Sequence, residues 1–138
     1  MSDSNNFTKF ANNIKQVLMA HLYIFGTILL TVTSQLIMKW RMSLKGAMPE
    51  GYFDKIIFLL QALFDPFVFI SIVLTFLGGL SWMAAMTKFD ISYAYPFISL
   101  SFILILVLSP VFFTETITTQ KVLGLIFIIV GIIISSRS

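Results

Sequence analysis

Five polar residues in the first long apolar stretch of the sequence could bind a ligand inside a membrane. Thr27, Thr31, Gln35 and Lys39 follow one another at steps of four, and Ser34 lies beside Gln35. Steps of four place side chains on one face of a helix. Because hydroxyl, amide and ammonium groups need partners in hydrocarbon, we expect this stripe to face protein or a water-filled cavity. The stripe holds no acid, so it offers a ligand hydrogen bonds and one cation.

A second polar group surrounds Pro96 in a later apolar stretch. Tyr95 and Ser99 are four residues apart and Tyr93 is close in sequence. A proline inside a helix removes a backbone hydrogen bond and kinks the helix. We therefore expect a kink at Pro96, with these three hydroxyl groups gathered around it. Both tyrosines are also typical of the aromatic belt at a membrane boundary. The depth of Tyr95 favours a binding site there, whereas site and belt stay open for Tyr93.

Charged residues at one membrane boundary form the third group. Glu115 follows the stretch that contains Pro96 and lies on the same side of the membrane as Lys39. One expectation is an ion pair between the two side chains, which would join their helices or guard an opening. The alternative is that each side chain reaches separately for the headgroups. Lys39 and Arg41 could also receive a phosphate, a common role of basic residues at the interface.

The remaining composition argues against several classes of function. The chain has one histidine, His21, and no cysteine. No cluster of carboxylates or histidines is visible, so we expect no metal, no cofactor and no catalytic residue. A lone histidine at a membrane boundary is more typical of a structural role. The net charge of +3 is too small and scattered for nucleic acid, and it fits contact with membrane lipids.

The elements that must position these residues are transmembrane helices. The chain is 58% hydrophobic and 11% charged, whereas a soluble domain holds roughly a quarter charged residues. We therefore predict an all-α membrane protein with a polar N-terminal arm over residues 1–16 that is frayed or lies at the surface. The transmembrane domain takes up residues 17–138, and its four spans, each able to cross about 30 Å of hydrocarbon, are residues 20–40, 66–87, 92–113 and 118–136.

The segment between the first two spans allows two interpretations. Polar residues of 52–64 share one helical face and apolar residues cover the rest, which is typical of a helix in the plane of the interface. Alternatively, the segment lengthens the second span and Pro66 kinks it. The later turns are short, so neighbouring spans should be antiparallel and both termini should lie on one side. Basic residues are nearly balanced between the two sides, so the sequence predicts no orientation.

Two pairs of glycines are candidates for helix contact or bending. Gly124 and Gly131 are seven residues apart on one face of the fourth span. Small residues at such spacing let helices approach closely in lipid, which favours a dimer contact. Gly78 and Gly79 in the second span indicate a packing position or a hinge.

In their order and spacing these features resemble the small multidrug resistance group of the drug/metabolite transporter superfamily, over about residues 22–136. Residues 30–39 are similar to the first span of that group, 92–96 to the start of the third, and 124–131 to the glycine pair of the fourth. The resemblance implies four short spans and a dimer that is formed through the fourth span.

Two positions depart from the drug exporters of this group. They carry a glutamate in the first span that exchanges a cation for protons, and Thr31 stands at that position here. They also carry a tryptophan where Ile98 stands. A neutral threonine cannot hold a cation electrostatically or carry the proton, so cation/proton exchange loses its physical basis.

The sequence is more similar to the subunits of the aminoarabinose-phosphoundecaprenol flippase. The shared pattern consists of Gln35, Leu36 and Lys39, then residues 94–100 with Ala-Tyr-Pro, then Glu115 and a fourth span rich in isoleucine and glycine. This resemblance implies a transporter of the bacterial inner membrane. It would move a polyprenyl-phosphate-linked monosaccharide between leaflets for cell-envelope glycan or lipid A modification.

The resemblance also implies roles for the residues named above. Lys39 and Arg41 would attract the phosphate, while Thr31, Ser34, Gln35, Tyr95 and Ser99, with Tyr93 and Glu115 at the boundaries, would line the sugar site. The partner would be an identical chain or a related four-helix subunit, with Pro96, Gly78 and Gly79 as bending points. Two alternatives remain: an exporter of small polar or cationic compounds, and an accessory subunit that only stabilises a membrane enzyme.

Overall fold

The computed structural model describes residues 2–136 as a set of helices joined by short loops. In chain order they are α1 (Ser2–Lys45), α2 (Tyr52–Leu63), α3 (Pro66–Met86), α4 (Ile91–Ile98), α5 (Leu100–Phe113) and α6 (Thr119–Ser136). Three stretches are long and apolar enough to cross a membrane, namely residues 6–45, 66–86 and 91–113, and residues 119–134 form a shorter apolar helix. The all-α class is confirmed, and the chain is a multi-pass membrane protein.

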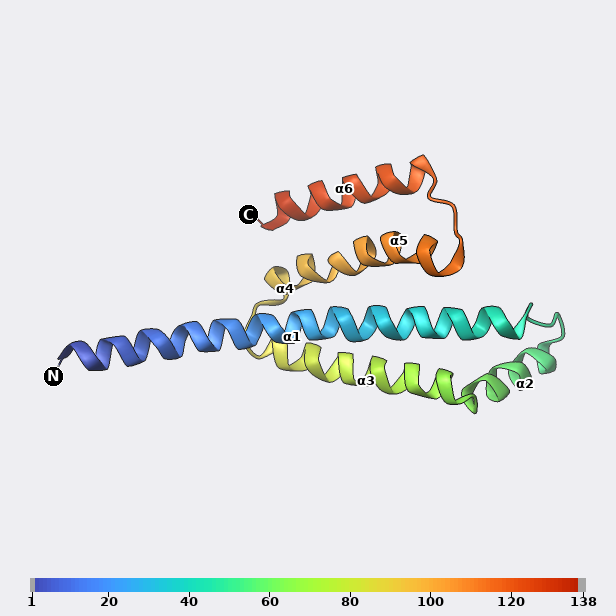
Figure 1. The fold of residues 1–138 in the computed structure, drawn as a ribbon, viewed down its shortest axis with the longest axis horizontal. Helices are drawn as coiled ribbons and strands as arrows, with labels where there is room; N and C mark the ends of the chain where they lie inside the picture. The colour runs from blue at the N-terminus through green and yellow to red at the C-terminus, as the bar shows by residue number, and fades with distance from the viewer. Residues whose placement is uncertain (1, 137–138) are drawn as a thin grey trace.

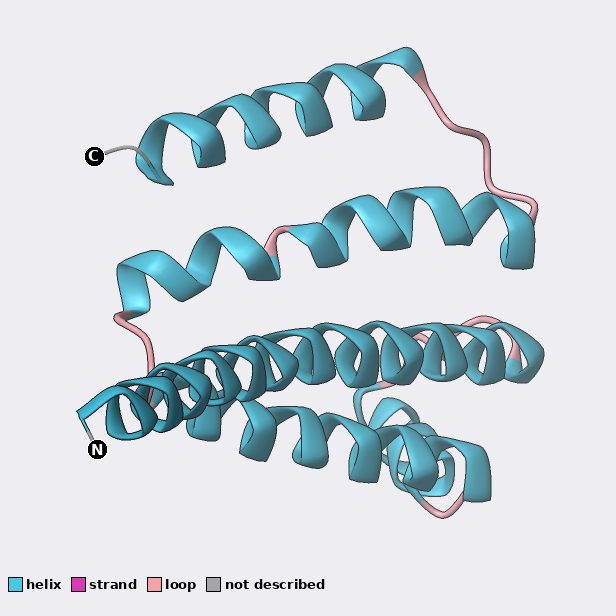
Figure 2. Cartoon of the chain, turned by 60° about the vertical axis from the view of Figure 1, so that its left-hand side comes forward, coloured by secondary structure: helices cyan, strands magenta, loops and turns pink. Residues whose placement is uncertain are grey.

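The helices lie side by side in a row. Figures 1 and 2 show α1 between α3 and the α4–α5 pair, with α6 on the far side of that pair. Successive long helices run in opposite directions, as the short turns predicted. The core lies where α1 meets the ends of α3 and α4, around Ile24, Ile28, Val32, Ala85 and Ala94. Helix α6 is at the edge of the row, so most of its side chains are exposed.

The N-terminal arm, which was expected to be frayed or to lie at the surface, is part of helix α1. It runs without a break from Ser2 to Lys45, and Figure 1 shows its N-terminal part projecting beyond the other helices. The physical reason is that neither glycine nor proline occurs between residues 2 and 25. Since nothing interrupts the backbone hydrogen bonds, the helix of the first span continues outward as an exposed rod.

The segment after the first span forms a separate helix, which settles one open alternative. Helix α2 ends at Leu63, and Asp65 has extended backbone angles with φ −70° and ψ 128°. The Asp65 carboxylate accepts a hydrogen bond from the Phe67 N–H at 3.0 Å, and Pro66 takes the first position of α3. An acidic N-cap followed by proline is a strong helix start. Residues 52–64 therefore do not lengthen the second span as one kinked helix.

The third apolar stretch is broken between α4 and α5, three residues after Pro96. Pro96 lies inside α4, and Ser99 ends this helix with its N–H on the Pro96 carbonyl at 3.2 Å. Ser99 and Phe102 each donate a backbone hydrogen bond to the carbonyl three residues back, so the chain tightens for one turn where α5 begins. Figure 2 shows this break as a short loop within the third apolar stretch.

A close contact between α1 and α3 fixes the position of these two helices. A Cβ added at Gly78 would lie 3.1 Å from the Thr31 hydroxyl oxygen and 3.5 Å from the Leu30 Cβ. A Cβ at the neighbouring Gly79 would meet nothing within 4 Å. Gly78 is thus a packing position, as is typical of small residues between membrane helices. Helix α3 is continuous through both glycines, and bending at this point during transport stays a prediction.

These neighbours provide a matched test of the α1–α3 contact. We expect Gly78→Leu to separate the helices and to destabilise the fold by about 1–3 kcal/mol, the usual cost of overpacking. Gly79→Leu points to open space and should leave the thermal midpoint of the detergent-purified protein unchanged. Equal midpoints for the two variants would show that α1 and α3 do not pack as described.

Candidate functional site

The first residues of the predicted polar stripe, Thr27, Thr31 and Ser34, lie on the side of α1 that faces α3. The Ser34 hydroxyl donates to the Ser71 carbonyl oxygen at 2.7 Å and shares a hydrogen bond with the Thr75 hydroxyl. Thr27 is buried and donates to the carbonyl oxygen of Tyr23 at 2.9 Å. The hydroxyl groups of Thr27 and Ser34 thus find their partners within the protein, and Thr31 lies against Gly78. A role in binding substrate remains a prediction for Thr31 and Ser34.

The last residues of the stripe, Gln35 and Lys39, point away from α3. With 3.6 residues per turn, each step of four advances the side-chain direction by about 40°, so three steps from Thr27 to Lys39 amount to about 120°. Gln35 is accordingly exposed, and Lys39 reaches the end of α5, where its ammonium pairs with the Glu115 carboxylate. Ser109 donates a hydrogen bond to the second carboxylate oxygen of Glu115. Of the two sequence interpretations, the structure contains the ion pair.

An apolar groove opens beside this ion pair. It lies between α1 and α5 and has a volume of about 570 Å³. The Lys39 ammonium lies 5.2 Å from the centre of the Phe113 ring, which also forms part of the groove wall. A cation over an aromatic face is stabilised by the ring electrons. The apolar side chains of the wall are Leu36, Ile37, Trp40, Leu108, Phe112 and Phe113.

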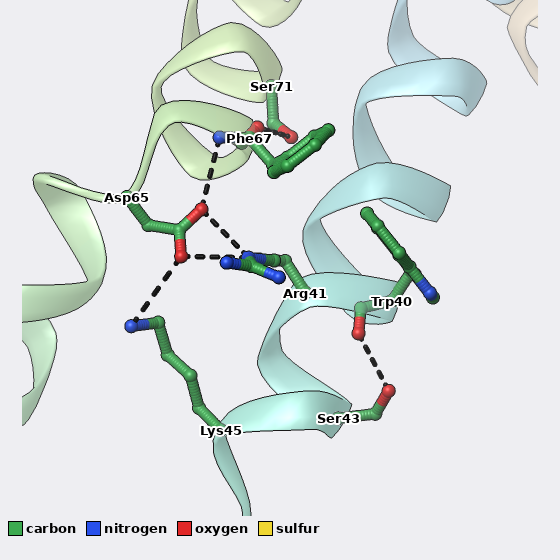
Figure 3. Close-up of polar contacts among 7 residues, drawn as sticks. All are labelled: Trp40, Arg41, Ser43, Lys45, Asp65, Phe67 and Ser71. Carbon is green, nitrogen blue, oxygen red and sulfur yellow. Dashed lines mark hydrogen bonds and ion pairs between the residues drawn. The ribbon is translucent and has the colours of Figure 1, made fainter.

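Arg41 does not join Lys39, which changes the predicted pair of phosphate-binding cations. Its Nε donates to both carboxylate oxygens of Asp65 at 2.9 and 2.8 Å, and the Lys45 ammonium lies 3.7 Å from Asp65 Oδ2. Figure 3 shows the three side chains converging at the start of α3. Arg41 is fourteen residues after Thr27, and steps of seven fall about 20° short of two turns, so it stays on the α3 side of α1. Its charge is therefore engaged within the protein.

The Asp65 carboxylate has a lowered pKa. Burial alone would raise its pKa, but the Arg41 hydrogen bond and the backbone N–H of Phe67, with the positive charge of Arg41, outweigh that effect. Asp65 therefore caps α3 and holds the end of α1 at the same time. The sequence analysis missed this partnership. The signals that could have revealed it are the spacing of Thr27, Ser34 and Arg41 and the Asp-Pro start of a helix.

The aromatic residues of the third stretch lie at the opposite end of the bundle. His21 Nδ1 lies 2.8 Å from the Val17 carbonyl oxygen, and His21 Nε2 lies 3.3 Å from the Tyr93 hydroxyl. Because the Val17 oxygen can only accept, Nδ1 carries a hydrogen, and in the neutral imidazole the Tyr93 hydroxyl then donates to Nε2. Tyr95 packs edge-on against Trp82, and Ser99 lies at the break between helices. Lys39 is 18 residues from His21, about 27 Å along a helix, so the predicted residues form two separate groups.

The other predicted positions are less engaged. A Cβ at Gly124 or Gly131 would meet no atom within 4 Å, so both glycines have open space beside them on α6. A second groove of about 450 Å³ lies between α4 and α6. Within residues 2–136, no three acidic or histidine side chains come together in a way that could hold a metal ion.

The Arg41–Asp65 contact predicts how stability depends on pH. Since folding lowers the pKa of Asp65, the contact stabilises the fold above the unfolded carboxyl pKa of about 4 and is lost as acid protonates the folded carboxylate. We expect the thermal midpoint of the wild type to fall below about pH 4. Asp65→Asn, which keeps the cap, should start lower at neutral pH and change less with acid.

Asp54→Asn provides the control, because Asp54 is an exposed carboxylate on the neighbouring helix α2. Its midpoint should follow the wild-type curve over the whole pH range. The account of the Arg41–Asp65 contact is contradicted when the Asp54 and Asp65 variants give the same curve.

Curated proteins of known name are similar to most of this chain. It is 30% identical to the probable 4-amino-4-deoxy-L-arabinose-phosphoundecaprenol flippase subunit ArnF of Aeromonas hydrophila, over 90% of this chain and 84% of that protein. It is 31% identical to ArnF of Proteus mirabilis, over 85% and 91% of the two chains. It is 29% identical to the subunit ArnE of Pseudomonas savastanoi pv. phaseolicola, over 83% and 94%. These matches confirm the resemblance to flippase subunits.

No solved structure matches the chain. The family comparison is extensive, because the EamA-like transporter family matches residues 10–137, which include α1 from residue 10 onward, all the later helices and both members of the Lys39–Glu115 pair. On this match and on the relatives above, the chain belongs to the EamA-like transporter family.

Proposed function

We propose that this protein is a subunit of a flippase that moves a polyprenyl-phosphate-linked aminosugar across the bacterial inner membrane. The observation that carries the proposal is the Lys39–Glu115 pair at the mouth of the apolar α1–α5 groove. A lipid-linked sugar has a charged headgroup joined to an apolar chain, and this part of the protein offers both kinds of surface side by side. The names of the relatives support the same class of substrate.

In this proposal the chain crosses the membrane four times, with α6 as the last span. The lengths of α1, α3 and the α4–α5 pair support three of the crossings, and the apolar composition of residues 119–134 supports the fourth. His21 and Lys39 then mark the two interfaces, since their separation of about 27 Å along the helix is close to the hydrocarbon thickness of about 30 Å. The substrate headgroup passes between these two levels.

A second chain completes the transporter. Helix α6 has contacts on one side only, and the open space at Gly124 and Gly131 would let another helix approach closely. The partner is an identical chain or a related four-helix subunit, in keeping with the word subunit in the names of the relatives. The Pro96 break gives α4 and α5 some freedom to tilt separately during transport.

Transport in this proposal makes and breaks no covalent bond. The membrane-spanning residues contain hydroxyl and amide groups rather than a buried carboxylate. Thr31 lies against Gly78, and α3 and α5 contain no acidic residue. Exchange of a cation for protons needs an acid at such a position. This arrangement therefore favours a sugar headgroup over the small cation of the exporter alternative.

The primary amine of such an aminosugar allows a direct test in cells. Spheroplasts that lack the gene for this protein and carry it on a plasmid would be treated with a membrane-impermeant amine reagent, and labelled lipid would be measured by mass spectrometry. We expect Lys39→Gln to reduce labelling on the order of tenfold, as for the loss of one partly exposed charge contact. Lys121→Gln removes an exposed lysine elsewhere in the chain and should keep wild-type labelling.

The alternatives predict other results. An accessory subunit would keep its labelling in Lys39→Gln but lose it in Gly124→Leu, which blocks helix contact. Labelling that is the same with and without the protein would contradict the flippase proposal.

A further inference from the structure

The Lys39–Glu115 pair contains two opposite charges that are both accessible to a ligand. The side chains are 51% and 32% exposed, and each also contacts a second group of the protein. Lys39 lies over the Phe113 ring, and Glu115 accepts a hydrogen bond from Ser109. These second contacts can hold each side chain in place when the pair separates. A half-exposed ion pair has little net stability, so a ligand can compete for it at low cost.

The headgroup named for the relatives also carries two opposite charges. A 4-amino-4-deoxy sugar linked through phosphate to a polyprenol has an anionic phosphodiester and, at neutral pH, a cationic ammonium group. Most lipid phosphates would need only a cation from the protein. A carboxylate next to that cation would repel them, unless the ligand itself brought a positive charge. The presence of Glu115 beside Lys39 is therefore informative about the ligand.

We propose that Lys39 and Glu115 exchange their mutual ion pair for two ion pairs with a zwitterionic aminosugar-phosphate lipid. This inference rests on the proposed function and names the groups that select its substrate. Lys39 binds the phosphate, Glu115 binds the sugar ammonium, and the chain next to the phosphate enters the α1–α5 groove. Since one protein pair is replaced by two protein–ligand pairs, no charge is left without a partner. Glu115 thus determines specificity for the amine.

The groove favours a lipid with a single chain. It runs between only two helices, and its wall consists of aromatic and branched aliphatic side chains around Phe113, whose ring also carries the Lys39 cation. Charge and apolar surface meet at this ring, as phosphate and chain meet in the ligand. The groove between α4 and α6 is also apolar, but its lining of Tyr93, Pro96, Phe97, Leu100 and Ile132 includes no charged residue. It serves as the internal comparison.

A pair of ligands that differ only in the amine tests the role of Glu115. Binding to the detergent-purified protein, with any subunit that copurifies, would be measured by native mass spectrometry. The two ligands are 4-amino-4-deoxy-arabinose-phosphoundecaprenol and its N-acetylated derivative, which has lost the positive charge. We expect the wild type to bind the free amine roughly tenfold more tightly, the effect of one charge-assisted contact. Glu115→Gln should bind both lipids equally, and the N-acetylated lipid at least as tightly as the wild type does, because Lys39 has lost its competitor.

Three further variants test the other contacts. Lys39→Gln should weaken both lipids, and Lys121→Gln should weaken neither. Thr33→Trp fills the α1–α5 groove from an exposed position of its wall and should lower both affinities on the order of tenfold. Leu100→Trp places the same side chain in the second groove and should have no effect. Thermal midpoints close to that of the wild type would show that these variants fold.

Several results would overturn the inference. One is a Glu115→Gln variant that still prefers the free amine, and another is equal weakening of both lipids by that variant, which would mean a structural role. Phosphatidylethanolamine, which also has a phosphate and an ammonium group, should bind more weakly than the aminosugar lipid; equal binding would show that the site takes ordinary membrane lipid. If binding follows the expectations but labelling in spheroplasts does not depend on the protein, the binding site at Lys39 and Glu115 is supported and the flippase proposal fails.

Discussion

Hydrocarbon offers no hydrogen bonds, and this constraint shapes the contact between α1 and α3 on which the remaining helices depend. The hydroxyl groups of Thr27 and Ser34 donate hydrogen bonds to carbonyl oxygens, and α1 and α3 pack closely because Gly78 leaves room for Thr31. The ion pair of Arg41 and Asp65 lies at one end of this helix contact. Since α4 and α5 pack on the other side of α1, a shift of α1 against α3 would move Lys39 relative to Glu115.

The rotation of side chains around α1 divides its polar residues between structure and ligand binding. Residues spaced by seven stay against α3, whereas residues spaced by four drift away from it, by about 120° at Lys39. One helix can therefore hold its neighbour with hydroxyl groups and still present an ammonium group at a groove on another side. Lys39 is thus the last residue of the polar stripe and the one that points furthest from α3.

Much of the fold follows from local properties of the sequence. Runs of apolar residues marked the long helices, and Pro96 drew attention to the stretch that is broken three residues later, at Ser99. The Lys39–Glu115 pair was one of two expectations, because both residues end their spans on the same side. The partner of Arg41 was not predicted, since it depends on the rotation of α1 against α3 and on the return of the chain through α2 to Asp65. The outward extension of α1 was missed because polar residues alone do not end a helix, and no breaker precedes Gly26.

The central claim is that Lys39 and the adjoining groove hold a polyprenyl-phosphate-linked aminosugar. Mass spectrometry of the lipids that copurify with the protein tests it most directly, with Lys39→Gln purified in parallel from the same cells. The account predicts that a glycosylated polyprenyl phosphate is enriched with the wild-type protein and lost with Lys39→Gln. Recovery of ordinary phospholipids alone, in the same proportions for both proteins, would contradict it.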